Sequence, residues 1–71
     1  MRDTSGYALR MAYNDGRTDG RTFCRNHTQE ERATELQTMQ AAAHCARNAN
    51  EQRYHDGYIE ILTTWVDGIG A

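Results

Sequence analysis

The sequence predicts a small α+β domain in which an N-terminal β-hairpin is followed by two helices, in the order ββαα. Large apolar residues alternate with small or charged ones over residues 7–13, and Asn-Asp-Gly follows at 14–16. Together these features favour a strand and a tight reversal. Residues 51–67 instead place aromatic and aliphatic side chains at helical spacing. With 71 residues, the chain has room for one domain only, covering 1–71.

The predicted hairpin covers residues 7–24. Glycine accepts the positive φ that a tight reversal requires, so Gly16 suits the turn. The segment also contains a tandem copy of Asp-Gly-Arg-Thr, at 15–18 and again at 19–22. We interpret the first copy as the turn and the second as a β-bulge in the return strand. The register stays open, because a two-residue loop and a three-residue loop put different side chains on the inner face.

A helix is predicted over residues 29–47. Thr28 and Glu31 have the spacing of a capping box, in which each side chain bonds the backbone N–H of the other residue. Residues that favour helix then continue to about Arg47. The apolar stripe of this helix is narrow and mostly alanine, so we expect it to pack weakly.

A second helix is predicted over residues 51–67, with Asn48 or Asn50 as the preceding cap. Its apolar face consists of Tyr54, Tyr58, Ile61, Leu62 and Trp65. Gly57 is unfavourable there, and residues 58–66 are also rich in β-branched and aromatic types. A strand in that place would give the alternative order ββαβ.

Metal binding is not expected, although Cys24, His27, His44 and Cys45 are all potential ligands. The predicted helix would separate the first pair from the second by roughly 24 Å, which is too far for one tetrahedral site. A site shared between two chains stays open. The sequence contains no nucleophile elbow, phosphate loop or dinucleotide-binding glycine pattern. We therefore expect no cofactor and no enzymatic activity.

The small number of large apolar residues suggests that the chain is stabilised by homodimerisation or by a larger partner. No apolar run approaches the roughly 20 residues of a membrane span, and no charged-then-apolar leader opens the sequence. Two cysteines without such a leader indicate free thiols in a reducing cytoplasm. We expect a cytoplasmic protein with no membrane contact.

Charge and aromatic residues suggest the functional surface. All eight basic residues are arginine, and the net charge is −2. Six residues are expected to contact a partner: Arg10, Arg17, Arg21, Arg25, Tyr54 and Tyr58. The leading hypothesis is a small non-enzymatic interaction module that binds a larger protein. It would be an accessory or inhibitory factor of the kind that phages and mobile elements carry. The alternative is a dimeric nucleic-acid-binding protein whose hairpin arginines read DNA or RNA, which the negative net charge disfavours.

Overall fold

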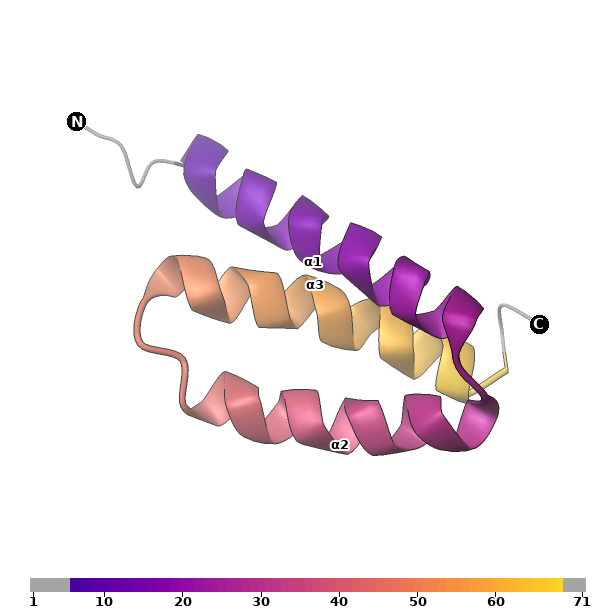
Figure 1. Ribbon diagram of the computed structural model, residues 1–71. Coiled ribbons are helices and arrows are strands. Elements are labelled where there is room, and N and C mark those ends of the chain that lie inside the picture. Colours follow the sequence, from indigo (N-terminus) through magenta and orange to yellow (C-terminus); the bar gives the residue numbers. More distant parts are fainter. Residues whose placement is uncertain (1–5, 69–71) are drawn as a thin grey trace.

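A computed structural model describes residues 6–68, and within that range it contains three helices and no strand. The first, α1, runs from Gly6 to Asn26, α2 from Gln29 to His44, and α3 from Ala49 to Val66. Figure 1 shows α3 between the other two helices, with α1 parallel to it and α2 antiparallel. The fold is an open three-helix bundle, because α1 and α2 both pack on α3 and hardly touch each other.

The predicted α+β class is therefore wrong in both of its forms, ββαα and ββαβ. Residues 7–24, expected as a β-hairpin, form most of α1, and residues 58–66 belong to α3. The tandem Asp-Gly-Arg-Thr repeat explains the error. Its period of four residues is close to one helical turn, so the repeat places like residues above one another on a helix. The same glycines that suggest a turn instead form one face of α1.

Glycines set the spacing between α1 and α3. A Cβ added to Gly16 would lie 2.0 Å from the carbonyl oxygen of Tyr54, and one added to Gly57 would lie 2.2 Å from that of Tyr13. A Cβ on Gly20 would meet the Cβ of Ile61 at 3.1 Å. Glycine normally destabilises a helix interior by about 1 kcal/mol relative to alanine. Here it permits a backbone-to-backbone approach that any side chain would prevent.

The second helix begins as the sequence predicts. The Thr28 hydroxyl accepts a hydrogen bond from the Glu31 N–H at 3.2 Å, and the Glu31 carboxylate accepts one from the Thr28 N–H at 2.9 Å. The helix ends at His44, three residues before the predicted end. The N–H of Cys45 bonds the carbonyl of Ala42 in a tighter turn, which stops the helix there.

The third helix also matches the predicted one closely. Asn48, rather than Asn50, is its cap, and the Asn48 side chain accepts a hydrogen bond from the Glu51 N–H at 2.9 Å. Gly68 adopts a φ of +83° directly after Asp67, as expected for the residue that ends a helix. The sequence Asp67-Gly68-Ile69 also predicts that Ile69 folds back onto this helix, but Ile69 lies outside the described residues.

The core lies between α3, the end of α1 and the middle of α2. Four buried apolar residues form it: Cys24, Tyr58, Ile61 and Leu62. Phe23, Leu36, Met39, Tyr54 and Trp65 pack around them. None of the residues of α2 is fully buried, which agrees with the weak packing expected of its alanine-rich face.

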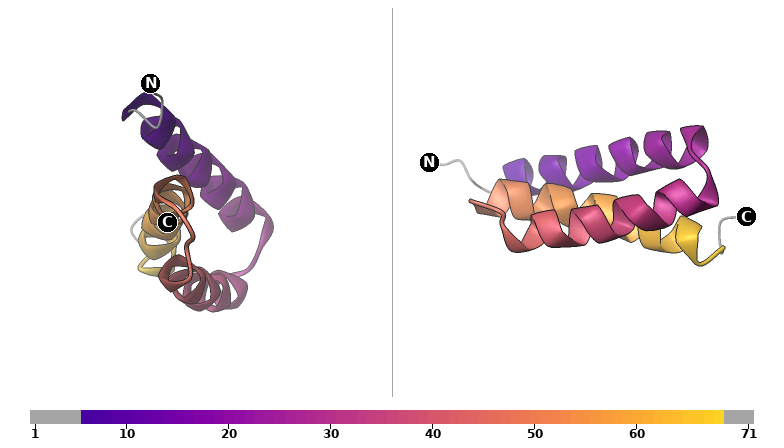
Figure 2. Two further views of the ribbon diagram at one scale, coloured as in Figure 1. Left: turned by 90° about the vertical axis from the view of Figure 1, so that its left-hand side faces the viewer. Right: turned by 60° about the horizontal axis from the view of Figure 1, so that its bottom comes forward.

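One end of the bundle is tied together by polar side chains of α2. The Arg32 guanidinium donates to the Cys24 carbonyl through Nε at 2.8 Å, and it lies over the Trp65 ring at 4.8 Å. The Gln29 amide donates to the carbonyl of Val66 at 2.6 Å. Carbonyl groups near the ends of α1 and α3 thus find partners on α2. Figure 2 shows α1 and α2 on different sides of α3, joined at this end.

Candidate functional site

A groove lies where the end of α1 meets the start of α2. It has a volume of about 510 Å³, and it forms because these two helices pack on different sides of α3. Its lining comes from the last turn of α1, from the residue that follows this helix, and from the first two turns of α2. The lining residues are Phe23, His27, Glu30, Glu31, Thr34 and Glu35.

Two stacked rings form the α1 side of the groove. The Phe23 and His27 rings lie with their centroids 3.8 Å apart and their planes within 9° of parallel. The Nδ1 atom of His27 is 2.8 Å from the carbonyl oxygen of Phe23, which fixes the imidazole against the end of the helix. Phe23 in turn packs on Tyr58 at a tilt, with centroids 6.4 Å apart. The rings are therefore held in place by backbone and core contacts.

Three carboxylates form the α2 side. Glu35 accepts a hydrogen bond from the Tyr58 hydroxyl at 3.1 Å, and Glu31 is held by the capping box. Within residues 6–68, the Glu30 carboxylate makes no hydrogen bond or ion pair. The three side chains all lie within the first two turns of one helix, so the groove carries a concentrated negative charge.

Two tyrosines of α3 donate hydrogen bonds to carboxylates, one to Asp19 of α1, outside the groove, and one to Glu35 of α2, in its lining. The Tyr54 hydroxyl donates to Asp19 of α1 at 2.5 Å, as the Tyr58 hydroxyl does to Glu35 of α2. Burial raises the pKa of Tyr54, and the hydrogen bond to Asp19 raises it further. Burial likewise raises the pKa of Tyr58, and the negative charge of Glu35 adds to this effect. Both phenols stay protonated at neutral pH and act as donors that position these carboxylates.

The six residues predicted to contact a partner differ in their exposure. Tyr58 is buried in the core and Tyr54 is half-buried against Asp19. Arg10 and Arg25 are exposed on α1, and Arg21 is half-buried. Their role as a binding surface stays a prediction.

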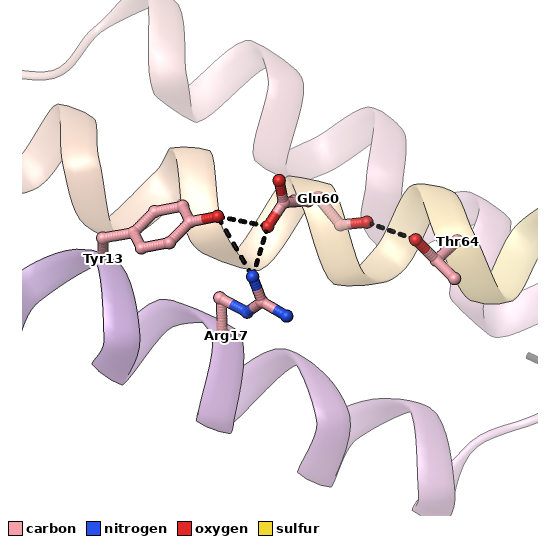
Figure 3. Close-up of polar contacts among 4 residues, drawn as sticks. All are labelled: Tyr13, Arg17, Glu60 and Thr64. Atoms are coloured by element: carbon pink, nitrogen blue, oxygen red, sulfur yellow. Dashed lines mark hydrogen bonds and ion pairs between the residues drawn. The ribbon is translucent and has the colours of Figure 1, made fainter.

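Arg17 is engaged within the chain rather than directed to solvent. Its guanidinium lies 2.9 Å from the Glu60 carboxylate and 5.6 Å from the centre of the Tyr13 ring. The Tyr13 hydroxyl donates to the same Glu60 oxygen. Figure 3 shows Tyr13 and Arg17 reaching from α1 to Glu60 on α3, while Thr64 bonds the Glu60 carbonyl. This cluster bridges α1 to α3 beside the glycine contact.

The groove residues were not predicted from the sequence. A hairpin over residues 7–24 separates Phe23 from His27, whereas in a helix residues four apart share a face. The period-four repeat over residues 15–22 was the available signal for a helix in this region. The capping box had already placed Glu30 and Glu31 in a first helical turn.

The cysteines and histidines do not come together. Within residues 6–68 no three His, Cys, Asp or Glu side chains are arranged to hold a metal ion. Cys24 is a buried free thiol whose pKa burial raises, whereas the free thiol of Cys45 is exposed. Whether two chains share a metal ion stays open.

Comparisons of this chain with protein-family models, with curated proteins and with solved structures found no match. Among the described residues, no helix combines the length and apolar character needed to cross a bilayer. The homodimer expected from the small core stays a prediction.

Proposed function

We propose that this chain is a protein-interaction module, an accessory or inhibitory factor that binds a segment of a larger protein in the groove between α1 and α2. The observation that carries this proposal is the groove itself, an open hollow with a wall of stacked rings at Phe23 and His27. Aromatic side chains in desolvated pockets supply much of the binding energy at protein interfaces.

The size of the groove suits a few side chains of a partner. Binding sites for small ligands commonly range from about 300 to 1,000 Å³. The volume of about 510 Å³ lies within this range and opens between two helices. An extended or helical segment could therefore insert side chains there while its backbone stays outside.

The walls of the groove are fixed before any partner arrives. On the α1 side, His27 is bound to the Phe23 carbonyl, and Arg32 is bound to the Cys24 carbonyl. On the α2 side, Gln29 anchors the start of the helix to Val66. Side chains that are already ordered lose less conformational entropy on binding, which favours recognition at a small surface.

The test is a comparison of captured proteins between two threonine variants of the tagged chain. Thr34 lines the groove, and Thr18 is exposed on α1 outside it. Thr34→Tyr fills the groove with a neutral ring, and Thr18→Tyr makes the same change elsewhere. Lysate treated with nuclease is passed over each variant and over the wild type, and bound proteins are quantified by mass spectrometry.

The expected result is at least one protein captured by the wild type and by Thr18→Tyr but lost with Thr34→Tyr. Circular dichroism would confirm that both variants remain folded. If Thr34→Tyr captures every protein as well as the wild type does, the groove is not the binding site. Capture that disappears with nuclease treatment would show that nucleic acid, rather than protein, is bound.

A further inference from the structure

We infer that the segment bound in the groove carries an arginine whose guanidinium stacks on the Phe23–His27 ring pair and is neutralised by Glu30 and Glu35. This inference rests on the proposed function and names the chemistry of the partner. It follows from three features of the groove: a stacked aromatic pair, carboxylates in the same lining, and charge complementarity with a cation.

The ring pair offers a surface suited to a planar group. The two rings are nearly parallel, with 9° between their planes, so the stack has a flat outer face. A guanidinium is planar and weakly hydrated, and it stacks on aromatic rings with less desolvation than an ammonium group. An arginine therefore gains more from this wall than a lysine does.

The α2 residues of the lining supply the negative charge. Glu30, Glu31 and Glu35 line the groove together, and a carboxylate can bind the two parallel N–H groups of a guanidinium. Glu31 already serves the helix start, and Glu35 has a second oxygen besides the one that Tyr58 bonds. Within residues 6–68 no arginine of the chain pairs with these three glutamates. A cationic partner would neutralise them in a partly desolvated site.

The chain uses the same combination internally at another place. Arg17 lies over the Tyr13 ring and binds the Glu60 carboxylate at 2.9 Å. Ring, guanidinium and carboxylate there form one cluster between two helices (Figure 3). The groove presents the ring and carboxylate components of this cluster to a partner.

The experiment is an NMR titration of the ¹⁵N-labelled full chain with three acetylated and amidated pentapeptides. The peptides differ only in the central residue, which is arginine, lysine or citrulline, the uncharged analogue of arginine. Chemical-shift changes at Phe23, His27, Glu30, Thr34 and Glu35 report on the groove. We expect the arginine peptide to bind there about tenfold more tightly than the lysine peptide, and the citrulline peptide to cause no groove shifts.

Variants separate the charge from the ring. Glu30→Gln with Glu35→Gln removes two charges while leaving an amide oxygen at residue 35 to accept from the Tyr58 hydroxyl. This change should weaken binding of the arginine peptide by about tenfold. Asp56→Asn with Glu60→Gln removes the same charge from α3, outside the groove lining, and should leave binding unchanged. Phe23→Leu keeps an apolar side chain but removes the ring, and should abolish the preference for arginine over lysine.

Equal binding of the three peptides, or shifts that map outside the groove, would overturn the inference. The inference would also fail if the two double variants, in the groove and outside it, weakened binding of the arginine peptide equally. That result would indicate attraction to the net charge alone. The captured partner distinguishes this failure from failure of the proposed function. If Thr34→Tyr loses the partner but the glutamine pair keeps it, the groove is a binding site for a segment of different chemistry. If neither change affects capture, both proposals fail.

Discussion

Alanine substitution of the glycines between α1 and α3 tests how the fold is held together. In most helix interiors a change from glycine to alanine is stabilising by about 1 kcal/mol, because alanine loses less conformational entropy on folding. At Gly16 and Gly57 we expect the opposite sign. The new methyl group would lie 2.0 Å from a carbonyl oxygen of α3 in the first case and 2.2 Å from one of α1 in the second.

The expected magnitude follows from these distances. Non-bonded heavy atoms rarely approach within about 3 Å, so the two backbones would have to separate by about 1 Å at either position. Overpacking of a tight contact costs about 1–3 kcal/mol, and backbone atoms cannot rotate away as side chains can. Because the obstacle is backbone, the upper end of about 3 kcal/mol applies, and subtracting about 1 kcal/mol of helix propensity leaves a net loss of about 2 kcal/mol. For a domain of this size that lowers Tm by roughly 8–16 °C.

Urea unfolding followed by far-ultraviolet circular dichroism measures the effect, with two further glycines as internal standards. Nothing lies within 4 Å of a Cβ on Gly6, so Gly6→Ala should leave the urea midpoint unchanged or raise it. A Cβ on Gly20 would meet Ile61 at 3.1 Å, which a small side-chain shift relieves, so Gly20→Ala should be intermediate. A total stability of roughly 4–10 kcal/mol leaves the expected loss measurable.

The order of the four variants decides the question. If Gly16→Ala and Gly57→Ala raise the urea midpoint as much as Gly6→Ala does, then α1 and α3 are not in backbone contact. The glycines of the tandem repeat would then not mark a close contact between α1 and α3.

Three further predictions concern the polar contacts. Thr28→Ala removes the acceptor for the Glu31 N–H and should lower the free energy of unfolding in urea by about 1 kcal/mol. Thr28→Ser keeps the hydroxyl and should restore this stability. An alanine variant as stable as the wild type would contradict the capping role. Arg17→Met should lower the free energy of unfolding by less than about 1 kcal/mol, because the side chains of Arg17 and Glu60 are 34% and 51% exposed. A loss of stability beyond about 2 kcal/mol would show that this ion pair contributes more than its exposure indicates. The pKa values of Tyr54 and Tyr58 are raised above the ordinary 10.0, so their contribution to stability is complete below about pH 10 and is lost as the pH rises toward the raised values. Urea midpoints should therefore fall above about pH 10, and less steeply in a variant with both tyrosines changed to phenylalanine; an unchanged slope would assign the effect to other groups.

The parts of the fold that could be predicted are those encoded by neighbours in sequence. The capping box at Thr28 and Glu31 involves residues three apart, and it marks the start of α2 correctly. The apolar face of α3 repeats at helical spacing, and Tyr58, Ile61 and Leu62 are indeed buried. Local hydrogen bonds and periodicity need no knowledge of the rest of the chain.

The first helix could not be predicted in the same way, because its stability depends on a partner distant in sequence. Gly16 and Gly20 are unfavourable in an isolated helix, and Asn-Asp-Gly is a strong turn signal. Only contact with Gly57 and its neighbours on α3, some 40 residues later, makes glycine favourable at these positions. Tertiary packing therefore overrides the local preference of residues 14–22.

The tight contact also explains where the groove forms. With α1 against α3 at backbone distance, and α2 held to α3 by side chains such as Leu36 and Met39, the bundle is not symmetric. The connection of residues 27 and 28 then brings the end of α1 beside the start of α2 without packing the two helices together. The capping and first-turn preferences of α2 place glutamates at that junction, since acidic residues suit a helix N-terminus. The start of α2 thereby lines the groove with carboxylates beside the Phe23 and His27 rings. The proposed binding of a cationic segment rests on this combination.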